Sequence, residues 1–172
     1  MQPPVRSNPV SDSASPRRAN VVGLGLIGGS VALGLRRIGW HVSGDDIDRV
    51  TAQQAIERGV VDALGLDPDA EVTFVAVPVL ATADQVKRAR AETAGAVTDV
   101  GSVKAAICAA TGDSRVVGGH PMAGSELDGL DGAQADLFEG AVWVLTPVAD
   151  SDDSVFSTVA SVVASLGAEV VA

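Results

Sequence analysis

The sequence predicts an α/β fold with a doubly wound, mainly parallel sheet and helices on both faces. Short apolar runs alternate along the chain with longer segments of helical periodicity, beginning with a run at residues 19–24. Glycine, which makes up 19 of the 172 residues, separates many of these segments. Short strands that alternate with helices pair in parallel through right-handed crossovers.

Stop signals and periodicity place the individual elements. Gly39 and Gly59 are positioned to end the first two helices, and Pro78 ends the most clearly apolar strand. The third helix is expected to turn Lys87, Arg88 and Arg90 toward solvent. In chain order, we expect strands at 19–24, 41–45, 72–77, 96–100, 115–118, 141–146 and 168–171; one helix ends at Gly39, and others span 48–58, 80–93, 102–111 and 153–166. The segment 119–140 is expected to be mostly loop.

Composition and charge exclude several classes of protein. A formal net charge of −10 argues against nucleic acid or an anionic membrane surface as a partner. No apolar run approaches the roughly 20 residues of a membrane-spanning helix. One cysteine and two histidines allow no internal disulfide and too few ligands for a structural zinc site, so no metal is expected. Residues 1–18 are rich in proline and serine, which predicts a disordered leader before one domain at 19–172. They lack the apolar core of a secretory signal, so we expect a cytoplasmic location.

A glycine motif marks the candidate cofactor site. Gly23, Gly25 and Gly28 form a G-x-G-x-x-G that leaves a strand and opens an amphipathic helix, as in Rossmann dinucleotide-binding domains. The first glycine permits a tight turn, the second lets backbone approach a pyrophosphate, and the third lets the helix pack on the strand. With Leu26 and Ile27, the helix start offers unpaired N–H groups to the phosphates. The alternative is a glycine turn without a ligand.

An acidic pair follows the second expected strand. Asp45 and Asp46 lie 17 and 18 residues beyond Gly28, close to the roughly 20 expected for a carboxylate on the adenosine ribose. A carboxylate there favours NAD over NADP, because it repels a 2′-phosphate, whereas the nearby Arg49 works against that preference. We rank Asp46 above Asp45 as the ribose ligand, and the other would be a surface aspartate.

Four features lie where expected strands end, at the edge of the sheet where ligands bind. They are Asp46, Pro78, the dipeptide Gly101-Ser102 and His120. Among them His120 is the candidate general base, because an imidazole that titrates near neutral pH can accept a proton from an alcohol as hydride leaves the same carbon. It lies in the segment GGHPMAGSE, where we expect a loop. A loop histidine bonded to backbone is the alternative.

The motifs GLGLIGGS, GDDID, VAVPV, TDVGSVK, GGHPMAGSE and LFEGAVWVLTP together resemble the prephenate/arogenate dehydrogenases of tyrosine biosynthesis. The resemblance runs from about residue 21 to residue 172. It implies an NAD-dependent oxidative decarboxylation of prephenate to 4-hydroxyphenylpyruvate, CO2 and NADH, with arogenate as the alternative substrate. Hydride passes from ring C4 to the nicotinamide, and the ring becomes aromatic as CO2 leaves.

The resemblance also implies roles for individual residues. His120 would hydrogen-bond the C4 hydroxyl and assist its deprotonation, and Ser102 would orient both groups. Ser125 and Glu126 would lie at the substrate pocket, Glu126 at its mouth. Asp46 matches the ribose acid of the family, and the residue before it is an aspartate where the family has an aromatic side chain, which adds negative charge.

Family members continue with a helical domain that forms a homodimer and supplies an arginine for the substrate carboxylates. This sequence ends at Ala172, so we expect the isolated chain to bind NAD, to bind prephenate poorly, and to turn over slowly or not at all. Two alternatives stay open. One is a β-hydroxyacid type of dehydrogenase, which relies on a lysine of its second domain, and the other is an NAD-binding module without turnover.

Overall fold

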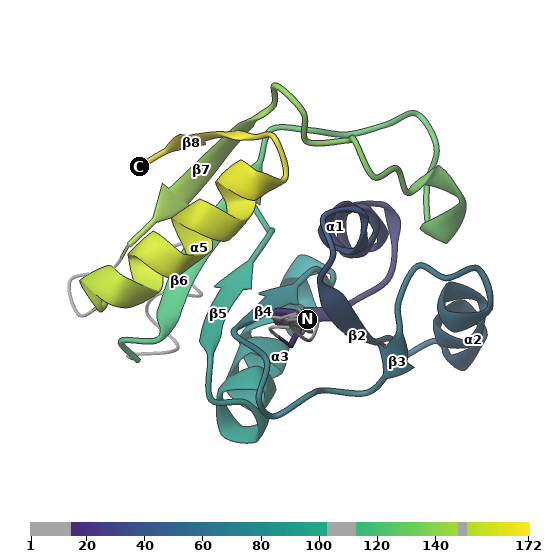
Figure 1. Cartoon of the computed structure of the whole chain (residues 1–172), viewed down its shortest axis with the longest axis horizontal. Helices are drawn as coiled ribbons and strands as arrows, with labels where there is room; N and C mark the ends of the chain where they lie inside the picture. Colours follow the sequence, from purple (N-terminus) through teal and green to yellow (C-terminus); the bar gives the residue numbers. More distant parts are fainter. Residues whose placement is uncertain (1–14, 103–112, 148–150) are drawn as a thin grey trace, which may run out of the picture.

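The computed structural model describes residues 15–102, 113–147 and 151–172. Within these ranges the strands form one eight-stranded sheet in the order β3-β2-β1-β4-β5-β6-β7-β8 (Figure 1). The elements are β1 Arg18–Val22, α1 Leu26–Arg37, β2 His41–Asp45, α2 Arg49–Glu57, β3 Ala63–Leu64, β4 Val72–Val75, α3 Val79–Glu92, β5 Ala96–Asp99, β6 Val116–Pro121, the 3-10 turn η1 Leu130–Gly132, β7 Val142–Thr146, α5 Asp153–Ser165 and β8 Glu169–Val171.

The sheet is wound in two directions from its centre. Strand β1 pairs with β2 on one side and with β4 on the other, both in parallel. From β1 the chain passes through α1 to β2, and from β4 it passes through α3 to β5, so the direction of winding reverses between β1 and β4. This arrangement confirms the predicted doubly wound α/β fold. The reversal opens a crevice at the carboxyl ends of the two central strands, which is where such sheets bind ligands.

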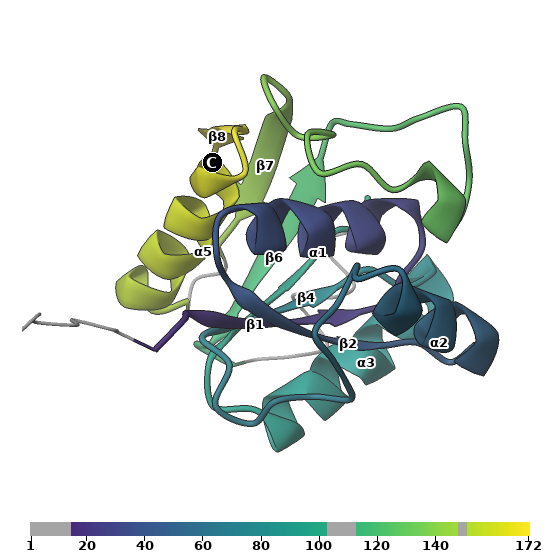
Figure 2. The ribbon, with the colours of Figure 1, turned by 45° about the vertical axis from the view of Figure 1, so that its right-hand side comes forward.

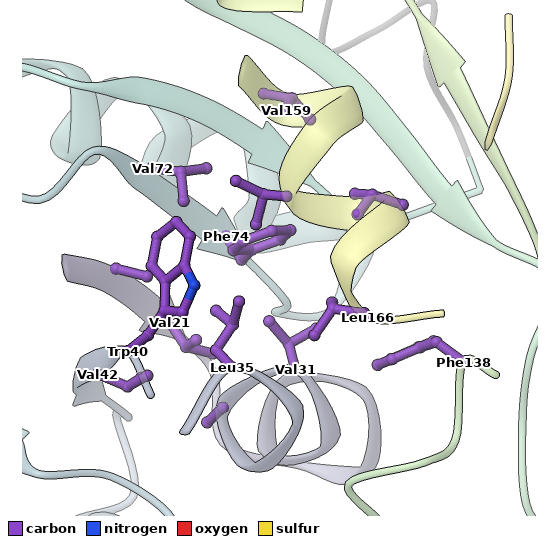
Figure 3. Packing of buried hydrophobic residues seen from close by; sticks show 14 of the residues in the cluster. Val21, Val31, Leu35, Trp40, Val42, Val72, Phe74, Phe138, Val159 and Leu166 are labelled. Atoms are coloured by element: carbon purple, nitrogen blue, oxygen red, sulfur yellow. The ribbon is translucent and has the colours of Figure 1, made fainter. Parts of the chain in front are cut away.

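Helices cover both faces of the sheet. Helices α1 and α5 lie over one face and α3 lies over the other (Figures 1 and 2). On the first face, Val31 and Leu35 of α1 pack toward Phe74 of β4 and Leu166 at the end of α5 (Figure 3). On the second face, α3 closes a smaller cluster made of Val75, Val86, Ala89, Val97 and Val116. The main core therefore fixes α1, whose first turn borders the crevice, firmly against the central strands.

Local signals in the sequence predicted where several elements end. Gly39 and Gly59 have φ of 89° and 67°, the left-handed conformation that ends α1 and α2. Pro78 was predicted to end the strand at 72–77, but β4 already ends at Val75, and Pro78 is instead the N-cap of α3. Strand β3, only two residues long, was not predicted. Apart from its first residue, the helix predicted at 102–111 lies outside the described residues, as do residues 1–14 of the predicted leader.

The prediction of a loop at His120 was wrong. Strand β6 continues through Gly119 and His120 to Pro121, because β7 returns antiparallel to it and supplies hydrogen-bonding partners, with His120 opposite Val144. Parallel pairing was expected here as elsewhere, but the described chain from β6 to β7 contains only η1 and no crossover helix. Pro121 ends the strand, as a residue without a backbone donor can. The candidate base thus lies on the sheet.

An acidic residue ties α3 to the start of β6. Asp113 accepts hydrogen bonds from the guanidinium of Arg90 and from the backbone N–H of Arg115. Burial raises the pKa of the Asp113 carboxyl, but the backbone bond from Arg115, the bond from Arg90 and both positive charges outweigh it, so the pKa lies below its ordinary value. The Asp113 carboxyl therefore binds a proton more readily in the unfolded chain than in the folded chain.

Acidification is expected to weaken the fold through this carboxyl. The stabilisation is fully present above the ordinary pKa of an aspartate, about 4, and is lost as the pH falls through the lower pKa of the folded state. We expect the free energy of unfolding, measured in urea, to fall less steeply below about pH 4 in Asp113→Asn than in the unsubstituted chain. Asp84, whose side chain is 84% exposed, is the control, and Asp84→Asn should leave the slope unchanged. Equal slopes in all three proteins would contradict the prediction.

Candidate active site

A cleft of about 1110 Å³ opens at the carboxyl ends of the central strands. It lies at the reversal of winding between β1 and β4, as the predicted crevice does. Six of the predicted cofactor residues line it, namely Gly23, Gly25, Leu26, Ile27, Asp46 and Pro78. The other lining residues are Val22, Gly44, Asp45, Ile47, Arg49, Ala52, Gln53, Leu64, Ala76, Val77, Ala81, Gln85, Arg88, Val100, Gly101, Asp128 and Gly129.

The three motif glycines meet different surroundings. Gly23 has φ of 89°, and a Cβ there would lie 2.3 Å from the carbonyl oxygen of Ala76. A Cβ on Gly28 would lie 1.8 Å from the carbonyl oxygen of Gly23. The first contact agrees with the predicted tight turn, and the second shows that α1 packs closely on that turn. A Cβ on Gly25, in contrast, would meet no atom within 4 Å, so the absence of a side chain there leaves open space at the cleft.

The start of α1 presents backbone donors to this space. Its N-cap is Gly25, which has no side chain to cap the helix, and no acidic residue lies in the first turn. Leu26 and Ile27 of that turn line the cleft. Uncapped N–H groups and the positive end of a twelve-residue helix make this edge suitable for an anionic group such as a diphosphate.

The two aspartates after β2 have different partners. Asp46 accepts hydrogen bonds from the backbone N–H of Leu24 through Oδ2, at 2.7 Å, and from that of Asp48 through Oδ1, at 2.8 Å. The carboxylate thereby connects the end of β2 to the glycine turn. Each oxygen keeps a second lone pair that could accept from a ribose hydroxyl. Asp45 instead forms an ion pair with Arg88 of α3, which offsets the negative charge that this aspartate adds.

The position of Arg88 corrects one expectation. Arg88 lines the cleft and its guanidinium pairs with Asp45, whereas we expected this side chain to face solvent. The hydrogen bond to Asp45, followed by that to Glu92, raises the pKa of Arg88 above its ordinary value. Arg90 also turns inward, to Asp113, and only Lys87 of the three predicted solvent-facing cations is more than half exposed. The missed signal is a stripe that begins at Pro78 and continues at helical spacing through Ala81, Gln85 and Arg88.

His120 is oriented by backbone from the neighbouring strand. Its Nδ1 lies 3.4 Å from the carbonyl oxygen of Val100. Because a carbonyl can only accept, Nδ1 must carry the proton in this contact, which leaves Nε2 with a free lone pair. Val100 and Gly101 both line the cleft, and exposed Ser102 follows them directly. The structure therefore brings His120 and the Ser102 segment together beside the cleft, although neither side chain lines it.

A buried carboxylate joins the segments that carry these two residues. Asp99, which is fully buried, accepts from the N–H of Gly101 through Oδ2 at 2.9 Å and from the N–H of Gly119 through Oδ1 at 3.2 Å. These glycines directly precede Ser102 and His120. Asp99 was not among the predicted site residues, although its place at the carboxyl end of a buried strand is a usable signal.

The predicted substrate residues lie farther along the loop after β6. Ser125 accepts a hydrogen bond from the N–H of Leu127 at 3.2 Å, and Glu126 is exposed. Neither lines the cleft, but the loop returns to it at Asp128 and Gly129, which were not predicted as site residues. Across the described ranges, no group of three His, Cys, Asp or Glu side chains could hold a metal ion. None of the helices described there has the length and hydropathy needed to cross a membrane.

Comparisons with curated proteins point to one family. The family model described as the nucleotide-binding domain of prephenate dehydrogenase matches residues 31–172. The prephenate dehydrogenase of Bacillus subtilis is 34% identical over 147 residues, which are 77% of this chain and 40% of that protein. A probable prephenate dehydrogenase of Streptomyces niveus is 32% identical over 158 residues, with coverage of 88% and 44%. The chain thus spans less than half the length of these relatives.

Solved structures agree. The arogenate dehydrogenase of Synechocystis superposes with a TM-score of 0.84 and 36% identity, covering 90% of this chain and 58% of that one. Prephenate dehydrogenase from Aquifex aeolicus, solved with hydroxyphenyl propionate and NAD+, gives a TM-score of 0.81 and 28% identity, with coverage of 92% and 60%. The family model covers most of the chain and the fold agrees with it, so this chain belongs to the family of prephenate dehydrogenase nucleotide-binding domains.

Proposed function

We propose that this chain binds NAD and supplies the cofactor site and the general base for the oxidative decarboxylation of prephenate. The observation that carries the proposal is the position of an oriented imidazole, His120, beside a cleft whose glycine turn is tied to a carboxylate, Asp46. The family resemblance extends the proposal to a role in tyrosine biosynthesis, a cytoplasmic location and a homodimeric assembly. An oxidoreductase of this kind needs no metal from the protein.

The residues of the cleft fit NAD. The open space at Gly25 and the uncapped N–H groups of Leu26 and Ile27 would receive the diphosphate. Asp46 would accept from the adenosine ribose while it keeps its bonds to the glycine turn, and Pro78 would border the cofactor from the β4 side. When bound, NAD supplies the acceptor for a hydride. Gly23 and Gly28 would act indirectly, by setting the shape of the turn.

The proposed chemistry requires one proton transfer from the protein. With Nδ1 donating to Val100, the Nε2 lone pair of His120 would accept the proton of the C4 hydroxyl as hydride leaves C4. C4 becomes a carbonyl, and the bond between the ring and its carboxylate then breaks, with its electron pair entering the ring. CO2 leaves, the carbonyl oxygen regains a proton, and the ring becomes aromatic. Ser102 would orient the hydroxyl and the imidazole, and Ser125 and Glu126 would face the substrate.

Calorimetry with NAD, followed by prephenate, tests the proposal. We expect the chain to bind NAD, to respond weakly to prephenate, and to form NADH slowly or not at all at enzyme concentrations above that of substrate. Any prephenate-dependent NADH should disappear in His120→Asn, while NAD affinity is retained. Activity that survives this substitution would favour a lysine-dependent dehydrogenase. NAD binding without any response to prephenate would favour a dinucleotide-binding module, and no NAD binding would refute the proposal.

Arogenate is the second candidate substrate. The similarity to the Synechocystis arogenate dehydrogenase, at 36% identity over 90% of this chain, favours it. The two substrates differ in a keto or an amino group on the side chain, so the same proton and hydride transfers apply to both. Parallel titrations of the NAD-bound chain with prephenate and with arogenate would rank them.

A further inference from the structure

Among the described residues, two arginines line the cleft, and only one of them forms an ion pair. Arg49, in the first turn of α2, is exposed and makes no ion pair within the described ranges. Arg88, on α3, is held by Asp45 at the end of β2. Both arginines line the same cleft as Asp45.

Arg88 is fixed through several of its donors. Its Nη1 pairs with Asp45 and lies 3.4 Å from the side-chain oxygen of Gln85, and its Nε donates to Glu92 at 3.1 Å. The side chains of Arg88 and Asp45 are 37% and 29% exposed, so the pair is half-buried but reachable from the cleft. Two carboxylates therefore surround one guanidinium, and this corner of the cleft carries no excess positive charge.

We propose that the Asp45–Arg88 ion pair makes the cleft prefer NAD over NADP, because it occupies the guanidinium that would otherwise receive a 2′-phosphate. The inference rests on the proposed binding of a dinucleotide in this cleft. Guanidinium is the side-chain group best suited to phosphate, through two parallel charge-assisted hydrogen bonds. While Asp45 accepts from Nη1 of Arg88, that nitrogen is not free to pair with a phosphate, and a 2′-phosphate that approached it would be repelled by the Asp45 carboxylate.

The ion pair acts beside Asp46, which faces the same cleft. Asp46 is engaged by the glycine turn and would repel a 2′-phosphate whatever the state of Arg88. The Asp45–Arg88 pair adds a second obstacle to binding of a 2′-phosphate, and this one depends on the position of Arg88. A half-exposed ion pair contributes little to stability, so Asp45 can be neutralised without unfolding the chain. The two contributions can therefore be separated by substitution.

A double-mutant cycle tests the proposal, with the dissociation constants of NAD and NADP measured by calorimetry. In Asp45→Asn the released guanidinium should improve the affinity for NADP relative to NAD by about tenfold, the effect of one good charge-assisted contact. Most of that gain should vanish in the double variant Asp45→Asn with Arg88→Ala. Asp84→Asn removes one charge from an exposed position of α3 and should leave the ratio unchanged. Urea unfolding of each variant checks that it is folded.

Specific outcomes would overturn the proposal. One is an unchanged ratio of NADP to NAD affinity in Asp45→Asn. Another is a gain in NADP affinity that persists when Arg88 is replaced by alanine but disappears in Asp45→Asn with Arg49→Ala, because Arg49 would then be the residue that binds the 2′-phosphate. Should Asp45→Asn fold poorly, Glu92→Gln loosens the same guanidinium from α3 and should shift the ratio in the same direction by a smaller factor. If the unsubstituted chain binds neither dinucleotide, the proposed function fails; if it binds NAD and the cycle shows no coupling, only this inference fails.

Discussion

Replacing Gly28 with alanine is expected to destabilise the fold by about 3 kcal/mol or more and to abolish measurable NAD binding. The added Cβ would lie 1.8 Å from the carbonyl oxygen of Gly23 and 3.0 Å from the Cβ of Ala76, so α1 must move away from the turn. Helix propensity alone would predict the opposite sign, since alanine in a helix is favoured over glycine by about 0.5–1 kcal/mol. Urea unfolding and calorimetry with NAD would measure both effects.

Gly25→Ala is the matched control within the same motif. A Cβ there meets no atom within 4 Å, and the residue has an ordinary φ of −77°. We expect a stability change of about 1 kcal/mol or less, arising from the poorer N-cap, together with weaker NAD binding because a methyl group enters the cleft. If Gly28→Ala kept its stability and its affinity for NAD, close packing of α1 on the turn would not explain why the motif has a glycine at this position.

Asp99→Asn is expected to lower the free energy of unfolding by about 1–3 kcal/mol, the cost of a buried hydrogen-bonding group left without a partner. The carboxylate accepts from the N–H groups of Gly101 and Gly119 through different oxygens. An asparagine keeps one oxygen and turns an NH2 group toward the other N–H, so one of the two links must break. The segments that carry Ser102 and His120 would then separate.

Amide and imidazole NMR signals would locate this effect. Shifts concentrated at residues 101–102 and 119–120 would agree with a local link, and Asp84→Asn, an exposed acid on α3, provides the comparison at equal charge. An Asp99→Asn chain as stable as its parent, with unmoved signals at His120, would show that the carboxylate does not hold the two segments together.

The sequence predicted those features of the fold that depend on neighbours along the chain. The ends of α1 and α2 follow from Gly39 and Gly59, since a left-handed residue is a local requirement. The doubly wound order follows from alternating strands and helices, because crossover handedness leaves few topologies. The glycine turn follows from the spacing of its motif.

Features that depend on distant partners were not predicted. Gly119 to Pro121 have little strand propensity, and they extend β6 beyond the predicted strand because β7 pairs antiparallel with them. The two-residue strand β3 likewise exists only through its pairing with β2. Arg88 is 43 residues from Asp45 along the chain, and its charge alone predicts a solvent-facing side chain. A partner that arrives through tertiary packing cannot be inferred from local periodicity.

For the candidate site, sequence reasoning identified the glycine turn, Asp46, Pro78 and the segments of Ser102 and His120 as neighbours of one crevice. It did so because the carboxyl ends of parallel strands share an edge. It did not identify Asp99, whose importance depends on two backbone N–H groups that come together only in the folded sheet.

Strand β7, which pairs antiparallel with the strand of His120, carries a tryptophan whose fluorescence can report on this part of the sheet. Trp143, opposite Pro121 in β7, is fully buried against Phe138 and Phe74, and its indole Nε1 has no hydrogen-bond partner among the described residues. The sequence has no tyrosine and one other tryptophan, Trp40, which stacks under Arg17. Because the indole of Trp143 is fully buried, its fluorescence emission should be blue-shifted. The emission should shift to longer wavelength if water reached β6 and β7, the strand pair that carries His120.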